Sequence, residues 1–321
     1  MNTKKCKILV SATTFGKNDH SLITTLTEQV GVVVFNETGK PYKASQLADL
    51  LYGVDGFIAG LDEINETALF AADRLKVISR YGIGIDNIDL EYARKKKVVV
   101  TNTPGANAAS VAELAIGLIL SLLRNIPTAI VTTKKGEWKR FNGFTLVGKT
   151  VGIVGFGTIG KELARRLLGF QCTLLAYDPY LASESAKDFG VKLLPLEDVL
   201  SRSDVISLHL PVTNETRRLV DLTFLSTMKP GSYLVNTARG DIVDESALLD
   251  ALQSGHISGA ALDVFSEEPP DISKPIFSNP KVLVTPHMAA HTDGSTNAMG
   301  WMALTDCLAV LRGEEPKYRV V

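Results

Sequence analysis

The chain has 321 residues, enough for about two domains of ordinary size, each with a substantial hydrophobic core. Hydrophobic residues make up 45% and charged residues 21%, which disfavours intrinsic disorder and fibrous structure. Lys and Arg number 34 against 35 Asp and Glu, so the net charge of -1 supplies no general attraction for phosphate backbones. We therefore expect a folded globular protein that does not bind nucleic acid.

Neither a targeting segment nor a membrane span is indicated. The apolar run behind the N-terminal lysines covers only residues 8–10, and the longest apolar run, residues 114–123, is about half of the roughly 20 residues that a spanning helix needs. Cys6, Cys172 and Cys307 are odd in number and lack any CxxC or metal-binding spacing. We expect reduced thiols in a cytoplasmic protein.

Short β-rich runs alternate with helical patterns in the first third of the chain. In chain order, the expected strands cover residues 7–11, 31–35, 56–59, 75–80 and 98–101. Such alternation predicts a parallel sheet with crossover helices. A turn signal, Thr103-Pro104-Gly105, follows, and a domain boundary is expected near Asn102.

The next stretch, residues 106–124, is apolar around nearly its whole circumference and predicts a buried helix. We expect Asn125-Ile126-Pro127 to end it and the segment up to Gly148 to be an excursion. A second series of strands then follows, over residues 150–154, 173–177, 204–210, 232–236, 259–264 and 281–284. With a last helix over 293–313, the pattern predicts two doubly wound parallel sheets.

The first strand of the second series runs into a GxGxxG motif at residues 155–160. Gly155 permits a tight turn, Gly157 lets the backbone approach a pyrophosphate, and Gly160 allows close packing of helix on strand. The next strand ends at Asp178, where a carboxylate can accept hydrogen bonds from both ribose hydroxyls. Because this carboxylate repels a 2'-phosphate and no Arg stands beside it, the motif predicts NAD rather than NADP.

Polar residues follow three later strands of the same series: Arg239, the neighbours Glu267 and Glu268, and His287. Ligands of open α/β sheets bind beyond the carboxyl ends of strands, so we expect these side chains to converge. His287 suits acid/base chemistry during hydride transfer, and a Glu at its other ring nitrogen would fix the tautomer. Arg239 offers a planar fork for a substrate carboxylate. Spacing alone does not choose between Glu267 and Glu268.

Two other histidines receive lesser roles. His209, at the end of its strand, is expected to line the cofactor pocket rather than to donate protons. His291 stands four residues after His287, but Pro286 and the lack of a third ligand argue against a metal site. We therefore expect no metal.

Taken together, these motifs resemble the D-isomer-specific 2-hydroxyacid dehydrogenases, and most closely their phosphoglycerate dehydrogenase branch. The resemblance covers essentially the whole chain. The matching stretches are residues 79–90, 102–105, 111–114, 155–160, 177–179, 236–240, 261–265, 268–269 and 285–287.

The resemblance implies an NAD-dependent oxidoreductase that transfers a hydride between NAD(H) and a 2-oxo or D-2-hydroxy acid, with 3-phosphoglycerate as a candidate. The implied fold is a Rossmann NAD-binding domain, residues 103–290, inserted into a flavodoxin-like substrate domain, residues 1–102 and 291–321. The helix over 106–124 resembles one that packs across the two-fold axis of a homodimer.

Carried over by position, the resemblance makes Glu268, rather than Glu267, the partner of His287, and Arg239 the substrate-binding Arg. It implies a loop that binds the substrate carboxylate and includes Arg80, Gly82 and Ile83. The cofactor contacts that it implies, besides the glycines and Asp178, are Thr158, Ile159, Leu210, Pro211, Thr237, Ala238 and Asp263, the last facing the nicotinamide amide.

One departure bears on the substrate. Where close phosphoglycerate dehydrogenases have an Arg that holds the substrate phosphate, this chain reads Phe57-Ile-Ala-Gly-Leu-Asp62. A general reductase of glyoxylate or hydroxypyruvate is therefore an alternative. An NAD-sensing, corepressor-like binding protein of the same fold is a second alternative, from a different functional class.

Overall fold

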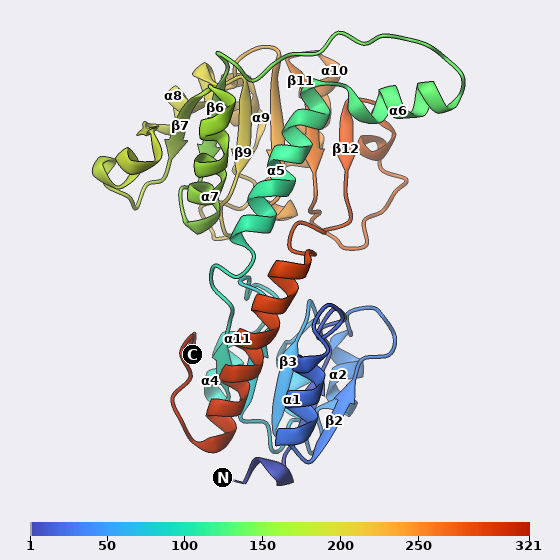
Figure 1. The fold of residues 1–321 in the computed structure, drawn as a ribbon, viewed down its shortest axis with the longest axis vertical. Helices are drawn as coiled ribbons and strands as arrows, with labels where there is room; N and C mark the ends of the chain where they lie inside the picture. Colours follow the sequence, from blue (N-terminus) through green and yellow to red (C-terminus); the bar gives the residue numbers. More distant parts are fainter. Residues whose placement is uncertain (1) are drawn as a thin grey trace. The chain divides into compact units, whose positions relative to one another are not determined.

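The computed structural model of the protein describes residues 2–321. The chain divides into two compact units, each built around one parallel sheet (Figure 1). Unit 1 comprises the chain up to Asn107 together with Ala290–Val321, and unit 2 comprises Ala108–Ala289. The two expected parallel sheets are thus confirmed.

Unit 1 holds five strands in the order β2-β1-β3-β4-β5, the flavodoxin-like doubly wound order, with its switch point between β1 and β3. The strands are β1 (Lys7–Val10), β2 (Val32–Phe35), β3 (Gly56–Ala59), β4 (Val77–Arg80) and β5 (Val99–Thr101). The helices are α1 (Ser21–Gln29), α2 (Ala44–Leu50), α3 (Glu66–Phe70), α4 (Leu90–Lys95) and α11 (Asp293–Arg312).

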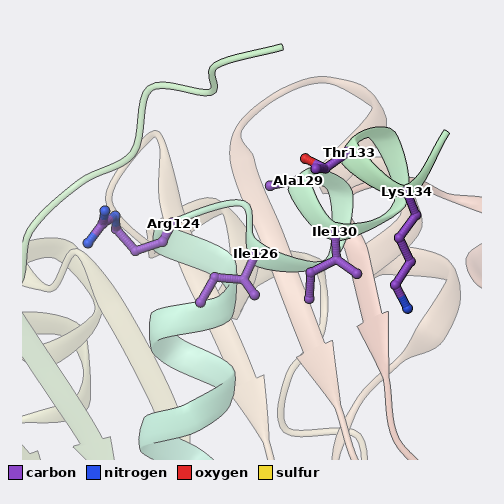
Figure 2. Close-up of a pocket in the computed structure, with 6 residues that line it drawn as sticks. All are labelled: Arg124, Ile126, Ala129, Ile130, Thr133 and Lys134. Carbon is purple, nitrogen blue, oxygen red and sulfur yellow. The ribbon is translucent and has the colours of Figure 1, made fainter. Parts of the chain in front are cut away.

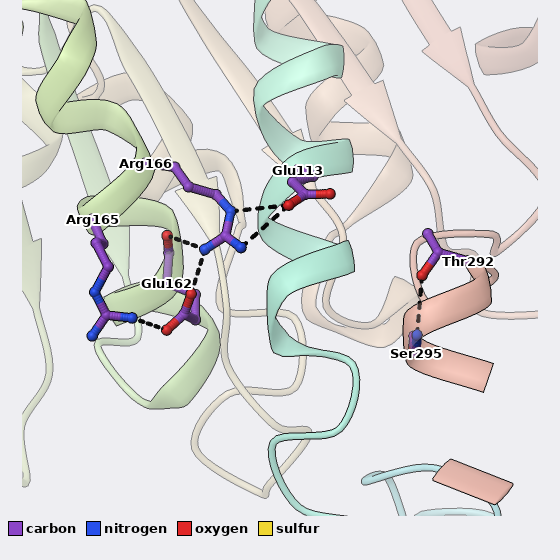
Figure 3. A network of polar contacts seen from close by, with 6 residues as sticks. All are labelled: Glu113, Glu162, Arg165, Arg166, Thr292 and Ser295. Carbon is purple, nitrogen blue, oxygen red and sulfur yellow. Dashed lines mark hydrogen bonds and ion pairs between the residues drawn. The ribbon is translucent and has the colours of Figure 1, made fainter. Parts of the chain in front are cut away.

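Helix α11 joins the C-terminal segment to the sheet of unit 1. It packs against β3, β4 and β5, and the buried Ser79 hydroxyl of β4 donates a hydrogen bond of 2.8 Å to the Ala303 carbonyl. At its start, the Thr292 hydroxyl accepts a hydrogen bond from the Ser295 amide at 3.2 Å, an N-cap that satisfies one free donor of the helix (Figure 3). The expected return of this helix to the first sheet is what the structure shows.

Unit 2 holds seven strands in the order β12-β11-β10-β9-β6-β7-β8, the Rossmann order, with its switch point between β6 and β9. The strands are β6 (Thr150–Val154), β7 (Thr173–Tyr177), β8 (Val191–Leu193), β9 (Val205–Leu208), β10 (Ser232–Asn236), β11 (Ile257–Leu262) and β12 (Val282–Val284). The helices are α5 (Ala108–Leu123), α6 (Ile126–Lys134), α7 (Thr158–Leu167), α8 (Leu196–Arg202), α9 (Leu222–Thr227) and α10 (Glu245–Gln253).

Hydrophobic side chains fill both faces of this sheet because successive strand residues point to opposite sides. Along β6, Val151 and Ile153 enter the core under α5 and α7, whereas Val154 enters the core on the other face. Burial on both faces explains why the strands read as continuous apolar runs rather than as alternating ones.

Two elements differ from the sequence prediction. Strand β8 was not expected, because it is only three residues long and its central Lys192 is exposed at the sheet edge. Helix α6 forms where a stop and an excursion were expected. Pro127 lies in its first turn, where the missing N–H is not needed, and Asn125, with φ +54°, separates it from α5.

Helices α5 and α7 are tied together by ion pairs at the surface (Figure 3). Arg166 of α7 donates to the Glu113 carboxylate of α5 from both Nε and Nη2 at 3.2 Å and also pairs with Glu162 one turn earlier. Arg165 binds Glu162 as well, and the hydrogen bond from Arg166 lowers the pKa of Glu162. Exposed pairs of this kind contribute only about 0–1 kcal/mol each, so they orient α7 more than they stabilise it.

Among the helices of residues 2–321, none is by itself long and apolar enough to cross a membrane. Helices α5 and α6 reach the required length and composition only as a pair, which is bent by 62° at the break between them. Helix α5 packs in the core of unit 2, where Ala112, Ala115 and Ile119 are fully buried.

Candidate active site

The GxGxxG residues form the turn between β6 and α7. A side chain at Gly155, which has φ +94°, would meet the His209 carbonyl oxygen at 2.4 Å, and one at Gly160 would meet the Gly155 carbonyl oxygen at 2.4 Å. At Gly157, in contrast, an added Cβ would meet nothing within 4 Å. Gly155 and Gly160 therefore bring strand and helix together, and Gly157 leaves open space before the helix.

That open space lies at the N-terminus of α7, where Gly157 is the N-cap residue and no side chain of the described residues caps the helix. Thr158, the first residue of the helix, is exposed and Ile159 is half-buried. Free N–H groups and the positive end of the helix dipole favour an anion at this position.

Asp178 lies beside this turn, directly after β7. Its Oδ2 accepts a hydrogen bond from the Phe156 amide at 2.9 Å, and its Oδ1 accepts one from the Tyr180 amide at 3.0 Å. The carboxylate is half-buried, and each oxygen has a further lone pair. It is therefore held next to the glycine turn in a state that can still accept hydrogen bonds from hydroxyl groups.

Buried polar atoms also follow β9 and β10, the next two strands on this side of β6. His209 follows β9, and its Nε2 lies 2.8 Å from the Ser207 hydroxyl, while its Nδ1 is buried without a hydrogen-bond partner among the described residues. The same holds for the hydroxyl of Thr237, which follows β10 beside the buried Ala238. Burial lowers the pKa of His209 to about 4, so its ring is neutral near pH 7. Leu210 packs against Gly155, and the next residue, Pro211, is exposed.

Glu268 and His287 form a close side-chain pair at the strand ends. His287 Nδ1 lies 2.6 Å from Glu268 Oε2, and Glu268 Oε1 accepts a hydrogen bond from the Phe265 amide at 3.1 Å. An ionised carboxylate only accepts hydrogen bonds, so Nδ1 carries the hydrogen and Nε2 is the ring atom left for a substrate. Glu267, the alternative that spacing left open, is exposed, and the carboxylate that contacts His287 is that of Glu268.

The Glu268 carboxyl is held in its ionised form. Burial raises its pKa, but the hydrogen bond and charge of His287, the Phe265 amide and the charge of Arg239 together outweigh burial and lower it. The two side chains remain accessible, with exposed fractions of 31% for Glu268 and 26% for His287. The pair therefore combines a charged acceptor with a ring that a small molecule can reach.

Arg239 belongs to a loop whose shape depends on its neighbours in the sequence. The Asn236 side chain accepts a hydrogen bond from the Ala238 amide at 3.0 Å and donates one to the Arg239 carbonyl at 2.8 Å. A Cβ at Gly240 would lie 1.9 Å from the carbonyl carbon of Phe265, so only glycine lets this loop approach the one that carries Glu268. Asn236 and Gly240 were not predicted as site residues; their place on either side of Arg239, where β10 ends, was the available signal.

Asp263, which follows β11, is fully buried, and its carboxylate accepts hydrogen bonds from Thr285, Met288 and Ala289. These donors flank His287, the residue that the sequence predicts as the acid/base. The resemblance also predicts that Asp263 faces the nicotinamide amide, and this contact stays a prediction.

In unit 1, Arg80, Gly82 and Ile83 form a tight loop after β4. Gly82 has φ +144°, and an added Cβ would lie 2.6 Å from Nη1 of Arg80, whose buried guanidinium also donates to the Tyr81 carbonyl. The Gly82 carbonyl accepts a hydrogen bond from the Thr103 amide, and the Ile83 carbonyl accepts one from the Asn102 side chain. The loop thus packs a buried cation against the buried backbone of Gly82.

Comparison with known proteins identifies the family. Residues 116–289 match the NAD binding domain of the D-isomer specific 2-hydroxyacid dehydrogenases. The chain belongs to this family. The resemblance read from the motifs is thereby confirmed.

Relatives in the family have several activities. The chain is 42% identical over 255 residues to the D-3-phosphoglycerate dehydrogenase of Methanocaldococcus jannaschii, an alignment that covers 78% of this chain and 48% of that protein. It is 40% identical to the hydroxypyruvate reductase of Thermotoga maritima, with 82% and 87% of the two chains covered. The chain therefore spans about half the length of the phosphoglycerate dehydrogenase it matches and most of the length of the reductase.

Solved structures of the family share the fold. A D-lactate dehydrogenase from Aquifex aeolicus, solved with NAD and lactic acid, superposes with a TM-score of 0.86 at 30% identity and covers 98% of this chain and 99% of its own. The NAD-binding domain match and this NAD-bound neighbour support NAD as the cofactor.

The residues present fit a dinucleotide. The open space at Gly157, the uncapped start of α7 and the Asp178 carboxylate suit a pyrophosphate and a ribose, and the buried Thr237 hydroxyl and His209 Nδ1 still have hydrogen-bonding capacity at the ends of β10 and β9. No group of three His, Cys, Asp or Glu side chains placed to hold a metal ion occurs in residues 2–321.

The space at Gly157 gives a direct test of the dinucleotide site. We expect Gly157→Ala to fold with a thermal midpoint close to that of the unaltered protein, because the added methyl meets nothing within 4 Å. The methyl would occupy the position of the pyrophosphate, so the NADH dissociation constant should rise by about tenfold or more, a loss of about 1.4 kcal/mol. Fluorescence titration with NADH measures it.

Gly169→Ala is the matched control, since Gly169 is also exposed with nothing within 4 Å of an added Cβ. It should leave NADH binding unchanged. If Gly157→Ala binds NADH as tightly as this control does, the pyrophosphate does not lie at the start of α7.

Proposed function

We propose that the chain is an NAD-dependent D-2-hydroxyacid dehydrogenase that interconverts a 2-oxo acid and its D-2-hydroxy acid. The observation that carries the proposal is the 2.6 Å contact of His287 Nδ1 with Glu268 Oε2, on two loops that follow adjacent strands of an NAD-binding domain. A His–carboxylate pair next to a nicotinamide site suits proton transfer coupled to hydride transfer.

When bound, NADH supplies the hydride for the substrate carbonyl carbon. In the same direction of reaction, His287 donates its Nε2 proton to the carbonyl oxygen, and in the other direction it takes the proton from the hydroxyl group. Glu268 keeps the hydrogen on Nδ1 and stabilises the protonated ring. Arg239 binds the substrate carboxylate through its guanidinium fork.

We propose that the Arg80–Gly84 loop also binds the substrate carboxylate. Support comes from the close approach of the Arg80 guanidinium to the Gly82 backbone and from the place of the loop at the carboxyl end of β4, where doubly wound sheets bind ligands. Gly82 and Ile83 would contribute backbone N–H groups, and Arg80 the charge.

Opposing observations bear on whether the substrate carries a phosphate. The relatives named phosphoglycerate dehydrogenase favour 3-phosphoglycerate. At the end of β3, however, the chain has the fully buried carboxylate of Asp62, which accepts hydrogen bonds from the Tyr42 and Gly60 amides at 2.8 and 3.0 Å and from the Ser11 hydroxyl. A buried anion at this strand end opposes a second anionic group and favours an unphosphorylated acid such as hydroxypyruvate or glyoxylate.

We propose further that the protein forms a homodimer. Helix α5 buries its apolar residues within unit 2, whereas α6 has no buried residue and exposes Ile126, Ile130 and Val131. A pocket of about 540 Å³ runs along α6 (Figure 2). Its lining residues are Arg124, Ile126, Ala129, Ile130, Thr133 and Lys134. Apolar helix faces of this kind suit a self-complementary interface.

Sedimentation at micromolar concentration tests this proposal, and we expect a dimer that Ile130→Asp converts to a monomer. A monomeric mass for the unaltered chain would contradict it.

We also propose a cytoplasmic location, which the free thiols of Cys6, Cys172 and Cys307 support. Recovery of the chain in the membrane fraction or the secreted fraction of cells would contradict this location.

The catalytic proposal is tested by initial rates of NADH oxidation with 3-phosphohydroxypyruvate, hydroxypyruvate, glyoxylate and 2-oxoglutarate. On the acid that reacts fastest, His287→Ala should lower kcat by about 10² to 10⁴-fold, because it removes the acid/base. Glu268→Gln should lower kcat less, since an amide can still orient the ring without supplying charge.

Glu267→Gln is the matched control, because Glu267 is the exposed neighbour of Glu268, and it should leave kcat unchanged. Turnover of none of the four acids, together with tight NADH binding, would overturn the catalytic proposal and favour the NAD-sensing alternative. Unchanged kcat in His287→Ala would remove this residue from the mechanism.

A further inference from the structure

Asp263 is enclosed by the segment that carries His287. Its side chain is fully buried, and its Oδ1 accepts hydrogen bonds from the Met288 amide, at 3.0 Å, and from the Thr285 hydroxyl. Its Oδ2 accepts one from the Ala289 amide at 3.0 Å, and its carbonyl oxygen accepts one from the His287 amide at 2.7 Å. Four donors from one short segment thus converge on one residue.

The backbone of this segment has an unusual conformation. His287 has φ +49°, in the left-handed region that residues other than glycine seldom occupy. After it, the Met288 and Ala289 amides turn toward the same carboxylate, an arrangement of successive N–H groups that binds anions. Here the anion is a side chain of the protein itself. The Asp263 carboxylate therefore favours the turn that His287 would otherwise resist.

Asp263 is itself fixed to the sheet. Its amide donates to the Asn236 carbonyl at 2.9 Å, which continues the pairing of β10 with β11. The Asn236 side chain in turn holds the Arg239 carbonyl at 2.8 Å. The His287 turn is consequently anchored, through Asp263, to the same strand end that shapes the Arg239 loop.

We propose that Asp263 is the positioning residue of His287: its buried carboxylate holds the left-handed turn that directs the His287 ring to Glu268. The proposal rests on the function proposed above, in which His287 exchanges a proton with the substrate. This role is separate from the nicotinamide contact implied by the family resemblance, because the three donors to the Asp263 carboxylate come from the His287 segment of the chain itself.

Asp263→Asn tests the proposal with a side chain of nearly the same shape. Its amide nitrogen must replace one oxygen and so face at least one N–H or O–H donor, which loosens the turn. Misplacement of a reacting group by about 1 Å can lower the rate about 10²-fold, so we expect kcat to fall by about tenfold to 10²-fold. The NADH dissociation constant should remain within about twofold, a change of about 0.4 kcal/mol.

A double-mutant cycle separates the two roles. If Asp263 acts through His287, Asp263→Asn should have almost no further effect on kcat in a His287→Ala background. If Asp263 instead contacts the nicotinamide amide, the two losses should multiply and NADH binding should weaken. The same comparison can be made with the 3-acetylpyridine analogue of NADH, in which a methyl group replaces the amide NH₂. If Asp263 acts through His287, Asp263→Asn should lower kcat by the same factor with NADH and with the analogue.

Amide hydrogen exchange supplies a readout that does not depend on turnover. Peptides covering residues 285–290 should exchange faster in Asp263→Asn than in the unaltered chain, because the Met288 and Ala289 amides lose their acceptor. Unchanged exchange in this segment would overturn the proposal even if no 2-oxo acid is reduced. Failure of the proposed function would leave the exchange result intact, so the two failures are distinguishable.

One further variant is a control and another is a second test. Asp306→Asn alters another buried carboxylate, in unit 1, which accepts the Lys317 and Tyr318 amides at 2.9 and 3.0 Å; it should destabilise the protein without lowering kcat. Thr285→Val keeps the Asp263 carboxylate and removes one donor. Should Asp263→Asn not fold, Thr285→Val carries the test: a lower kcat with unchanged NADH binding supports the proposal, and an unchanged kcat contradicts it.

Discussion

Parallel pairing in unit 2 continues past the ends of its strands and fixes where each loop of the site begins. The His209 amide binds the Val154 carbonyl at 2.8 Å, the Asp263 amide binds the Asn236 carbonyl at 2.9 Å, and the Thr285 amide binds the Leu262 carbonyl at 3.0 Å. All lie at the carboxyl edge of the sheet. The positions of the glycine turn, of Glu268 and of His287 follow from this constraint, because each loop starts from a hydrogen-bonded backbone position.

Two histidines at this edge have opposite surroundings. His209 is partly buried beside a hydroxyl group, and burial lowers its pKa to about 4, so its ring is neutral near pH 7. His287 is accessible and has the ionised Glu268 carboxyl as a partner. The environment, rather than the residue type, thus sets one histidine up as a neutral lining group and the other for proton transfer.

Much of this arrangement could be predicted from the sequence. The GxGxxG turn, the Asp178 that follows the next strand and the polar residues after later strands depend on local spacing, which a sequence displays directly. Helix α6 was missed because Pro127 is a stop signal in most contexts but is compatible with the first turn of a new helix. Spacing alone left Glu267 and Glu268 open, since neighbouring side chains can point either way and the Phe265 amide that holds Glu268 is visible only in three dimensions.

The part played by Asp263 was also beyond sequence reasoning. Its contacts join residues 22 or more positions apart in the sequence, and they depend on the left-handed backbone of His287, which no local pattern of residues indicates. Gly240 is similar: its position suggests a turn, but the need for glycine comes from the close approach of the Phe265 backbone.

The most direct test of the account is a crystal structure with NADH and oxamate, an unreactive analogue of a 2-oxo acid. We expect the oxamate amide oxygen within about 2.6–3.2 Å of His287 Nε2 and its carboxylate on the Arg239 guanidinium. Oxamate bound with that oxygen away from His287 while the His287–Glu268 contact is intact would contradict the central claim that this pair is the acid/base of the reaction.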